Sequence, residues 1–191
     1  MLSGRRLDLL NPSPLDIEIE DIAHGLSRVA RWNGQTIGEY PFSVAQHSLV
    51  VLDIANALNP NWQARWQLAA LLHDAPEYVV GDLISPFKAV LGLDYKAFEL
   101  RLLDAIHRRF GVPETLPESV AKSIKTADTI AAFFEAVGLA GFEHDEGQRY
   151  FGTPPRLSAK LQSTLEALTP WPTAIAQARF VERFTSLVAA L

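Results

Sequence analysis

The segment NWQARWQLAALLHD, residues 61–74, constrains the fold most strongly because it is apolar on nearly every side of a helix. Two sides carry apolar residues at helical spacing, one with Trp62, Trp66, Ala69 and Ala70, the other with Leu68, Leu71 and Leu72. A helix that is hydrophobic all round lies inside a protein. Pro76 removes an amide donor and disfavours helical geometry at Ala75, so we expect this helix to end or kink there.

Apolar residues recur at three- to four-residue spacing elsewhere in the chain. This periodicity predicts further helices at roughly 20–31, 43–58, 94–110, 118–138, 157–168 and 173–190. Ser43 followed by Gln46 predicts a capping box at the start of one of them. Strand patterns are weak, since only the short stretch IEIE at 17–20 alternates. The sequence therefore predicts an all-α fold.

Length and composition limit the class of protein. With 191 residues and no repeat or linker, we expect one domain over 1–191, with a core at 21–138 and C-terminal helices at 157–190 packed on it. The absence of cysteine excludes disulfides, zinc-thiolate sites and iron-sulfur clusters. Lacking a signal peptide and a membrane-length apolar stretch, the chain is expected to be cytoplasmic, without a membrane partner. A net charge of -5 argues against a nucleic-acid polymer as partner, although local arginines can bind a small phosphorylated ligand.

Two ligand-type residues directly follow the apolar helix. His73 lies eleven residues after Trp62, which places it on the tryptophan face and points it inward. A single histidine in such a place is usually a hydrogen-bonded core residue. The adjacent Asp74, however, adds a carboxylate that is costly to bury without a cation or donors. We therefore expect a positive group beside this pair.

His47 and Asp128 extend this set. His47 is the fourth residue of the capped helix and lies on its apolar stripe, where the positive helix N-terminus disfavours protonation and leaves the ring available to a metal. Asp128 interrupts a helix lined with alanine and phenylalanine. The ordinary alternatives are a core histidine and a solvated carboxylate. Together with His73 and Asp74, however, His47 and Asp128 form a set of two nitrogen and two oxygen ligands. Such a set suits one divalent Mn, Co, Ni, Fe or Zn ion better than Mg.

The order of His47, the pair His73-Asp74 and Asp128 resembles the H...HD...D motif of HD-domain metal-dependent phosphohydrolases. The stretches FSVAQHSLVV and LLHDAPEYVVGDLISPFK are similar, more narrowly, to the YfbR-like 5'-deoxynucleotidases and related phage dATP triphosphohydrolases. The resemblance covers about residues 21–134. It implies a helical bundle with the metal site in its centre, a divalent cation on these four residues, and hydrolysis of a nucleoside 5'-phosphate.

The same resemblance implies a catalytic residue and a sugar contact. Glu77 follows His73 by four residues, so a helical turn that survives Pro76 would bring both to one side. The matching family glutamate takes part in catalysis without binding the metal, and the aspartate matching Asp82 contacts the sugar. The alternatives are a first-turn helix charge for Glu77 and a turn cap for Asp82.

Arg31 and Trp32 match the arginine-aromatic pair that holds phosphate and screens the sugar in that family. A guanidinium binds phosphate oxygens through two donors, and an aromatic ring can close over a nucleoside. Helix lysines are more often solvated, but three are further candidates for phosphate contacts: Lys88, Lys122 and Lys125.

The resemblance leaves the substrate open between several nucleotides. We expect deoxynucleoside 5'-monophosphates to be the substrates. Two features favour the triphosphohydrolase branch instead: the pair Asn33-Gly34 and the longer loop to His47. A guanosine tetraphosphate hydrolase and a non-catalytic nucleotide-binding module are further alternatives. We also expect a homo-oligomer, a dimer or larger. A second HD pair, His144-Asp145, lies in a polar stretch at 141–155 that predicts a solvated loop, with an active-site lid as the alternative.

Overall fold

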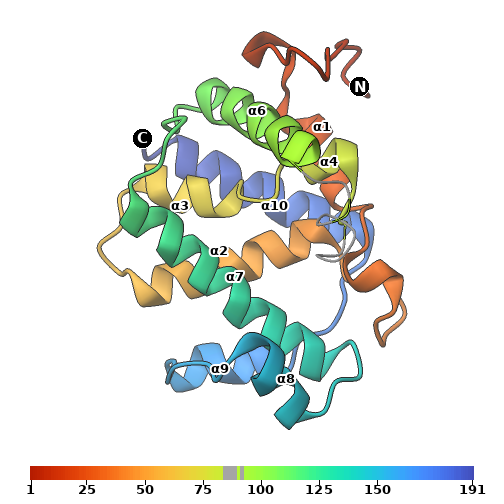
Figure 1. Cartoon of the computed structure of the whole chain (residues 1–191), viewed down its shortest axis with the longest axis vertical. Coiled ribbons are helices and arrows are strands. Elements are labelled where there is room, and N and C mark those ends of the chain that lie inside the picture. The colour runs from red at the N-terminus through yellow and green to blue at the C-terminus, as the bar shows by residue number, and fades with distance from the viewer. Residues whose placement is uncertain (84–89, 91–92) are drawn as a thin grey trace.

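The structure is a computed structural model of the chain and describes residues 1–83, 90 and 93–191 (Figure 1). Its elements are η1 (Pro14–Asp16), α1 (Ile19–Leu26), η2 (Arg31–Gly34), α2 (Val44–Leu58), α3 (Ala64–Leu71), α4 (Glu77–Val80), α6 (Leu93–Arg109), α7 (Glu118–Gly138), α8 (His144–Phe151), α9 (Ala159–Glu166) and α10 (Thr173–Val188). Among the described residues, extended backbone pairs only at an isolated bridge between Ala30 and Ser43. The all-α prediction is confirmed. Lys88 lies outside the described residues.

Helices α2 and α7 cross at the centre of the bundle (Figure 1). Helices α3 and α10 lie beside α2, and α8 and α9 pack against the C-terminal end of α7. Helix α2 is buried on nearly every side. Helix α3 is enclosed only in its C-terminal half, since Leu68 and Leu71 are fully buried whereas Trp62 and Trp66 are half-buried. The prediction of an interior helix at 61–74 is therefore confirmed only for residues 68–71. Within the described part of the chain, no helix is long and apolar enough to span a bilayer.

The break predicted at Pro76 occurs a few residues earlier. Helix α3 ends at Leu71, and α4 begins directly after Pro76. Between them the chain makes a helical turn, in which the Glu77 amide donates to the carbonyl of Asp74 at 3.0 Å. His73 and Asp74 thus lie in a tight turn at the end of a buried helix.

The predicted capping box at Ser43 is only half formed. The Ser43 hydroxyl accepts a hydrogen bond from the Gln46 amide, as expected. The Gln46 side chain does not return to Ser43, because it donates to the carbonyl of Thr169 at 2.8 Å and accepts from the amide of Trp171 at 2.9 Å. The predicted return bond from Gln46 to Ser43 is therefore absent, because the segment before α10 supplies hydrogen-bond partners to the buried side-chain amide of Gln46.

The solvated loop predicted at 141–155 is also corrected. Residues His144–Phe151 form α8, and Glu143 with Glu146 makes a reciprocal capping box at its start. Gly147 lies so close to α7 that an added Cβ would sit 2.7 Å from the Val137 side chain, so α8 packs tightly on α7. The side chains of His144 and Asp145 remain 64% and 100% exposed, which agrees with the expectation that this second HD pair is solvated.

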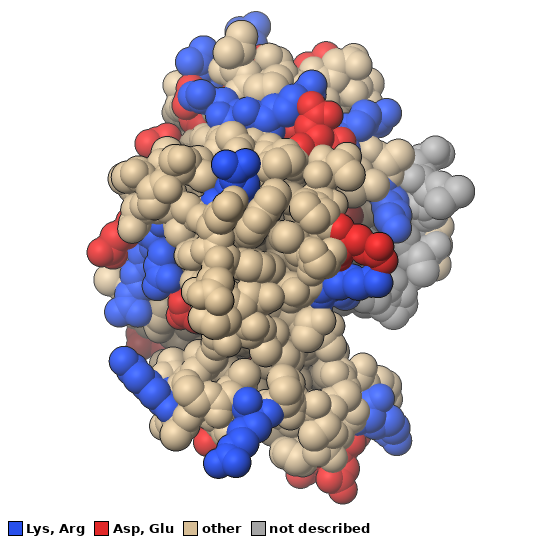
Figure 2. All heavy atoms as spheres, turned by 90° about the vertical axis from the view of Figure 1, so that its left-hand side faces the viewer, with Lys and Arg blue, Asp and Glu red and all other residues tan. Residues whose placement is uncertain are grey.

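Surface charge is mixed on the face drawn in Figure 2. Basic and acidic side chains lie interspersed around a broad area that carries few charges. This face therefore offers no continuous basic surface among the described residues.

Candidate metal centre

Four polar side chains converge where α2, α7 and the turn after α3 meet. His47 extends from the first turn of α2, and its Nε2 lies 3.4 Å from a carboxylate oxygen of Asp74 and 3.4 Å from one of Asp128. The Nε2 of His73 lies 3.2 Å from the same Asp74 oxygen. The two imidazole rings are 5.3 Å apart between centroids. The structure thus brings together all four residues that the sequence nominated as ligands.

The hydrogen bonds of the two imidazoles fix their tautomers. The Nδ1 of His47 lies 2.5 Å from Glu135 Oε1, and the Nδ1 of His73 lies 2.9 Å from the carbonyl of Ala70. Carboxylate and carbonyl oxygens only accept, so both Nδ1 atoms donate and each neutral ring presents a lone pair at Nε2.

The surroundings of the two Nε2 atoms show whether these residues fit a metal ion. Both Nε2 atoms are buried and have no hydrogen-bond partner among the described residues, and both face carboxylates. Lone pairs and carboxylates that face one another in a buried site repel unless a metal ion or a proton lies between them. Donor atoms of His47, His73 and Asp128 lie within 4.8 Å of one another, with Asp74 beside them. The set therefore fits one divalent cation with open positions for water and substrate.

Glu135 belongs to this centre and was missed by the sequence analysis. It is fully buried, and its Oε2 accepts hydrogen bonds from Arg31 Nε at 3.1 Å and Trp32 Nε1 at 3.0 Å. Burial alone would raise the pKa of Glu135, but Arg31 and His47 lower it to about 2. The available signal was its spacing of seven residues from Asp128, which puts both carboxylates on one face of α7. A carboxylate behind a metal-binding histidine orients the ring.

Arg31 connects the metal candidates to a further carboxylate. Its Nη1 lies 3.8 Å from Asp74 and 3.8 Å from Asp82, so the structure places Asp82 at the centre as well. Burial opposes the charge on Arg31, but Glu135, Asp74 and Asp82 together raise its pKa above its usual value. Arg31 is therefore a permanent cation beside the candidate ligands.

Trp32 has an unusual backbone and a packed ring. Its φ of 56° and ψ of 31° are left-handed, a conformation rare for a bulky residue. This geometry lets the consecutive side chains of Arg31 and Trp32 reach the same carboxylate oxygen. The indole ring packs edge-on against Phe142 and Phe151, at centroid distances of 5.7 and 6.0 Å. Trp32 is thus packed against α8 through Phe151 and against the segment before α8 through Phe142, and it is only partly exposed.

The remaining candidates differ in burial. Glu77 is only 2% exposed at the start of α4, one turn after the candidate ligands His73 and Asp74. Lys125 donates to Asp128 at 2.8 Å, whereas Lys122 pairs with exposed Glu118 on the surface of α7. Lys125 therefore reaches the centre and Lys122 is solvated.

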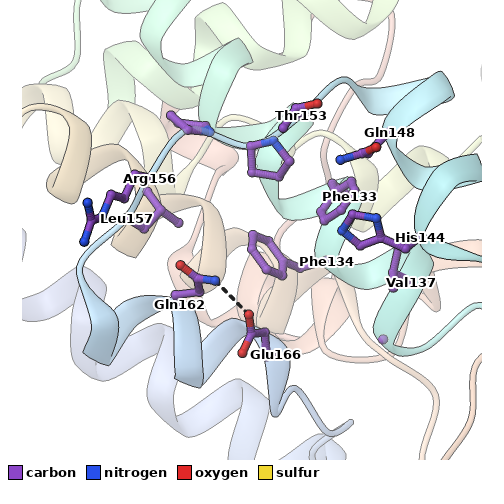
Figure 3. A pocket seen from close by; sticks show the side chains of 13 residues that line it. Phe133, Phe134, Val137, His144, Gln148, Thr153, Arg156, Leu157, Gln162 and Glu166 are labelled. Atoms are coloured by element: carbon purple, nitrogen blue, oxygen red, sulfur yellow. Dashed lines mark hydrogen bonds between the residues drawn. The ribbon is translucent and has the colours of Figure 1, made fainter.

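A cavity of about 260 Å³ adjoins the centre, between α3, α6 and α7. Its lining includes the candidate ligands His73, Asp74 and Asp128, with Leu103 and His107 among the opposite walls. A larger cavity of about 440 Å³ lies between α7, α8 and α9 (Figure 3), and none of the candidate ligands lines it. Convergent polar groups rather than volume therefore identify the functional site.

Without a metal, charge in the centre is balanced by a proton. Burial favours protonated forms of Asp74 and Asp128, yet the two imidazoles hold both pKa values below their usual range. Burial and Arg31 disfavour a proton on His47, but the surrounding carboxylates outweigh them and raise its pKa well above 6.5. The raised pKa thus favours a protonated His47 in the metal-free protein, whereas a bound metal requires the neutral ring that the helix N-terminus predicts.

This balance predicts a distinctive pH dependence of stability. A raised pKa in the folded state stabilises the fold below the unfolded pKa, and this contribution is lost as pH rises through the folded pKa. The lowered pKa values of the carboxylates act only in acid. The melting temperature of the chelated protein should therefore fall from about pH 6.5 upward, and added cobalt should oppose this because metal requires a neutral Nε2. A His47→Gln variant is the control, and a chelated wild type with the same pH profile as this variant contradicts the prediction.

Comparison with known proteins places this centre in a family. Residues 44–133, which contain all four candidate ligands, match the sequence model described as HD domain. The chain is 58% identical over 154 residues to the uncharacterized protein RCAP_rcc00048 of Rhodobacter capsulatus, which covers 81% of this chain and 79% of that protein. It is 30% identical over 172 residues to the uncharacterized protein YfdR of Escherichia coli, covering 90% and 85% respectively. The chain belongs to the HD-domain family of metal-dependent phosphohydrolases.

Proposed function

We propose that this protein is a 5'-deoxynucleotidase, which releases phosphate from deoxynucleoside 5'-monophosphates. The observation that supports it is the position of Arg31, a buried guanidinium whose Nη1 lies 3.8 Å from both Asp74 and Asp82. A phosphate monoester needs a cation and a directional donor on one side, and a sugar contact on the other. Asp74 is a candidate metal ligand and Asp82 a candidate sugar contact. Arg31 therefore lies beside both the candidate metal site and the candidate sugar site, where it can donate to a phosphate.

The side chains then have separate tasks. A divalent cation held by His47, His73, Asp74 and Asp128 would supply a Lewis acid and a water acidic enough to react near neutral pH. Arg31 donates to the phosphoryl oxygens and balances the negative charge that grows on them. Glu77 transfers the proton that the leaving 5'-oxygen of the sugar requires. Asp82 accepts a hydrogen bond from the 3'-hydroxyl, and Trp32 lies against the sugar where a 2'-hydroxyl would be.

A second candidate function is a deoxynucleoside triphosphate triphosphohydrolase. It is favoured by Lys125, which lines the cavity beside the centre and carries its ammonium 2.8 Å from Asp128. A lysine there could contact further phosphates of a longer chain. The product separates the candidates, because the triphosphohydrolase releases tripolyphosphate, a guanosine tetraphosphate hydrolase releases pyrophosphate, and the nucleotidase releases orthophosphate.

The test is a comparison of dAMP, AMP and dATP with the manganese- or cobalt-supplemented protein. We expect orthophosphate from dAMP at a higher rate than from AMP. Faster release of tripolyphosphate from dATP would assign the second function. Nucleotide binding without any product, across the metals, would assign a non-catalytic module.

The preference for deoxynucleotides is predicted to depend on Trp32. In Trp32→Ala, the ratio of dAMP to AMP turnover should fall toward one, because the ring that excludes a 2'-hydroxyl is gone. The fold-change in this ratio should exceed the fold-loss in the rate on dAMP. Phe142→Leu is the matched control, since it loosens the packing around the indole but keeps the ring. Equal rates on dAMP and AMP in the wild type contradict the steric argument.

A further inference from the structure

We infer that Glu135 is a positioning residue that couples metal binding to the choice of sugar. One carboxylate holds the candidate metal ligand His47 and also the candidate substrate contacts Arg31 and Trp32. The substrate half of this inference rests on the proposed function, whereas the metal half does not.

The geometry divides the two tasks between the two oxygens of Glu135. Oε1 accepts from His47 Nδ1 at 2.5 Å, and Oε2 accepts from both Arg31 Nε and Trp32 Nε1. The residue is fully buried, so water does not compete for these bonds. Rotation of the carboxylate to improve one bond therefore disturbs the other two. His47 and the pair Arg31-Trp32 lie on different elements and meet through this group.

The backbone of Trp32 gives a second, independent observation. Trp32 and Asn33 are the non-glycine residues of positive φ in the described chain, at 56° and 51°. Strained conformations of bulky residues persist only where the surroundings hold them. Two bonds to Oε2, one from each of Arg31 and Trp32, restrain this peptide. Weakening Oε2 as an acceptor releases the restraint, so that the indole and the guanidinium lose their relative position.

The decisive variant is Glu135→Gln, which keeps the size of the side chain. A glutamine offers one acceptor oxygen and one NH2 donor, so it cannot accept from all three groups. We expect the affinity for cobalt alone to fall about 10- to 100-fold, the usual effect of losing a partner behind a metal-binding histidine. The absorption spectrum of the cobalt-loaded protein should shift, and the dAMP to AMP ratio of kcat/KM should fall toward one.

Phe134→Leu is the matched control for a loss of stability. Phe134 precedes Glu135 on α7, and its ring faces the distant cavity of Figure 3. This variant should lower the melting temperature yet keep the cobalt affinity, the cobalt spectrum and the dAMP to AMP ratio of the wild type. A purely structural role of Glu135 predicts that both variants behave alike.

The outcomes separate the inference from the proposed function. Wild-type cobalt affinity in folded Glu135→Gln overturns the inference, as does reduced affinity with an unchanged sugar preference. If the wild type cleaves no nucleotide, the proposed function fails, and the sugar preference is measured as the rise in melting temperature with dAMP and with AMP. Equal shifts in the wild type then overturn the substrate half.

A second variant covers the case in which Glu135→Gln does not fold. Trp32→Phe removes the indole N–H together with the five-membered ring that carries it, and keeps a smaller aromatic ring against Phe142. If the coupling holds, this change, made on the substrate side, lowers the cobalt affinity severalfold, because Glu135 is less restrained behind His47. Unchanged cobalt affinity in Trp32→Phe overturns the coupling.

Discussion

Replacing Asp128 by alanine is expected to release the divalent metal and to lower phosphate release from dAMP by more than about 100-fold. Loss of a partner behind a metal-binding histidine costs roughly 10- to 100-fold, and loss of a ligand should cost more. Asp128 is the carboxylate that α7 contributes to the cluster with His47 and His73, at 3.4 Å from His47 Nε2. The measurements are metal content by elemental analysis and the rate with added manganese or cobalt.

Lys125→Ala provides the matched control for this prediction. Lys125 is the exposed partner of Asp128, one helical turn away, so its removal changes the local charge but leaves the ligand set intact. We expect this variant to retain its metal. A full complement of metal in Asp128→Ala would contradict the assignment of Asp128 as a ligand, and loss of metal in both variants would point to a disrupted helix.

The helices were predictable because their causes are local. The apolar period that predicts a helix at roughly 118–138, for example, agrees with α7 at Glu118–Gly138. Ser43 caps α2 through the amide three residues later, which is also a local bond. The error at α8 had a local cause too, because glutamate replaces the usual small N-cap residues in its reciprocal capping box.

The centre was predictable only in part. The order of His47, His73, Asp74 and Asp128 nominated the residues that the structure brings together, and Asp82 reaches the same place through Arg31. Their chemical roles remain predictions.

Long-range contacts account for what the sequence analysis missed. The three donors to Glu135 lie 88 to 104 residues away along the chain, so no periodic pattern around Glu135 reveals them. The raised pKa of metal-free His47 has the same long-range origin. Its helix N-terminus is visible in the sequence, whereas the carboxylates that raise its pKa come from α7 and from the turn after α3. Tertiary context decides charge and hydrogen bonding in this site.

The replacement of Glu77 by glutamine is expected to separate catalysis from metal binding. Glu77 is 2% exposed and begins α4, and its amide is bonded to the carbonyl of Asp74, so its backbone is fixed beside the candidate ligands. Glutamine keeps the size of the side chain but cannot carry the proton to the leaving 5'-oxygen. We therefore expect metal content to match the wild type while kcat on dAMP falls roughly 10²- to 10⁴-fold, the usual contribution of a positioned acid or base.

Two further measurements decide the role of Glu77. The acid-base role predicts that the residual activity of Glu77→Gln depends less on pH than that of the wild type, since the group that limits one side of the profile has been removed. Glu114→Gln, which alters an exposed carboxylate paired with Arg108, is the control and should keep both rate and profile. Loss of metal in Glu77→Gln would make Glu77 a ligand. An unchanged kcat would instead make it an ordinary charge in the first turn of α4, where a carboxylate stabilises the helix N-terminus without taking part in the reaction.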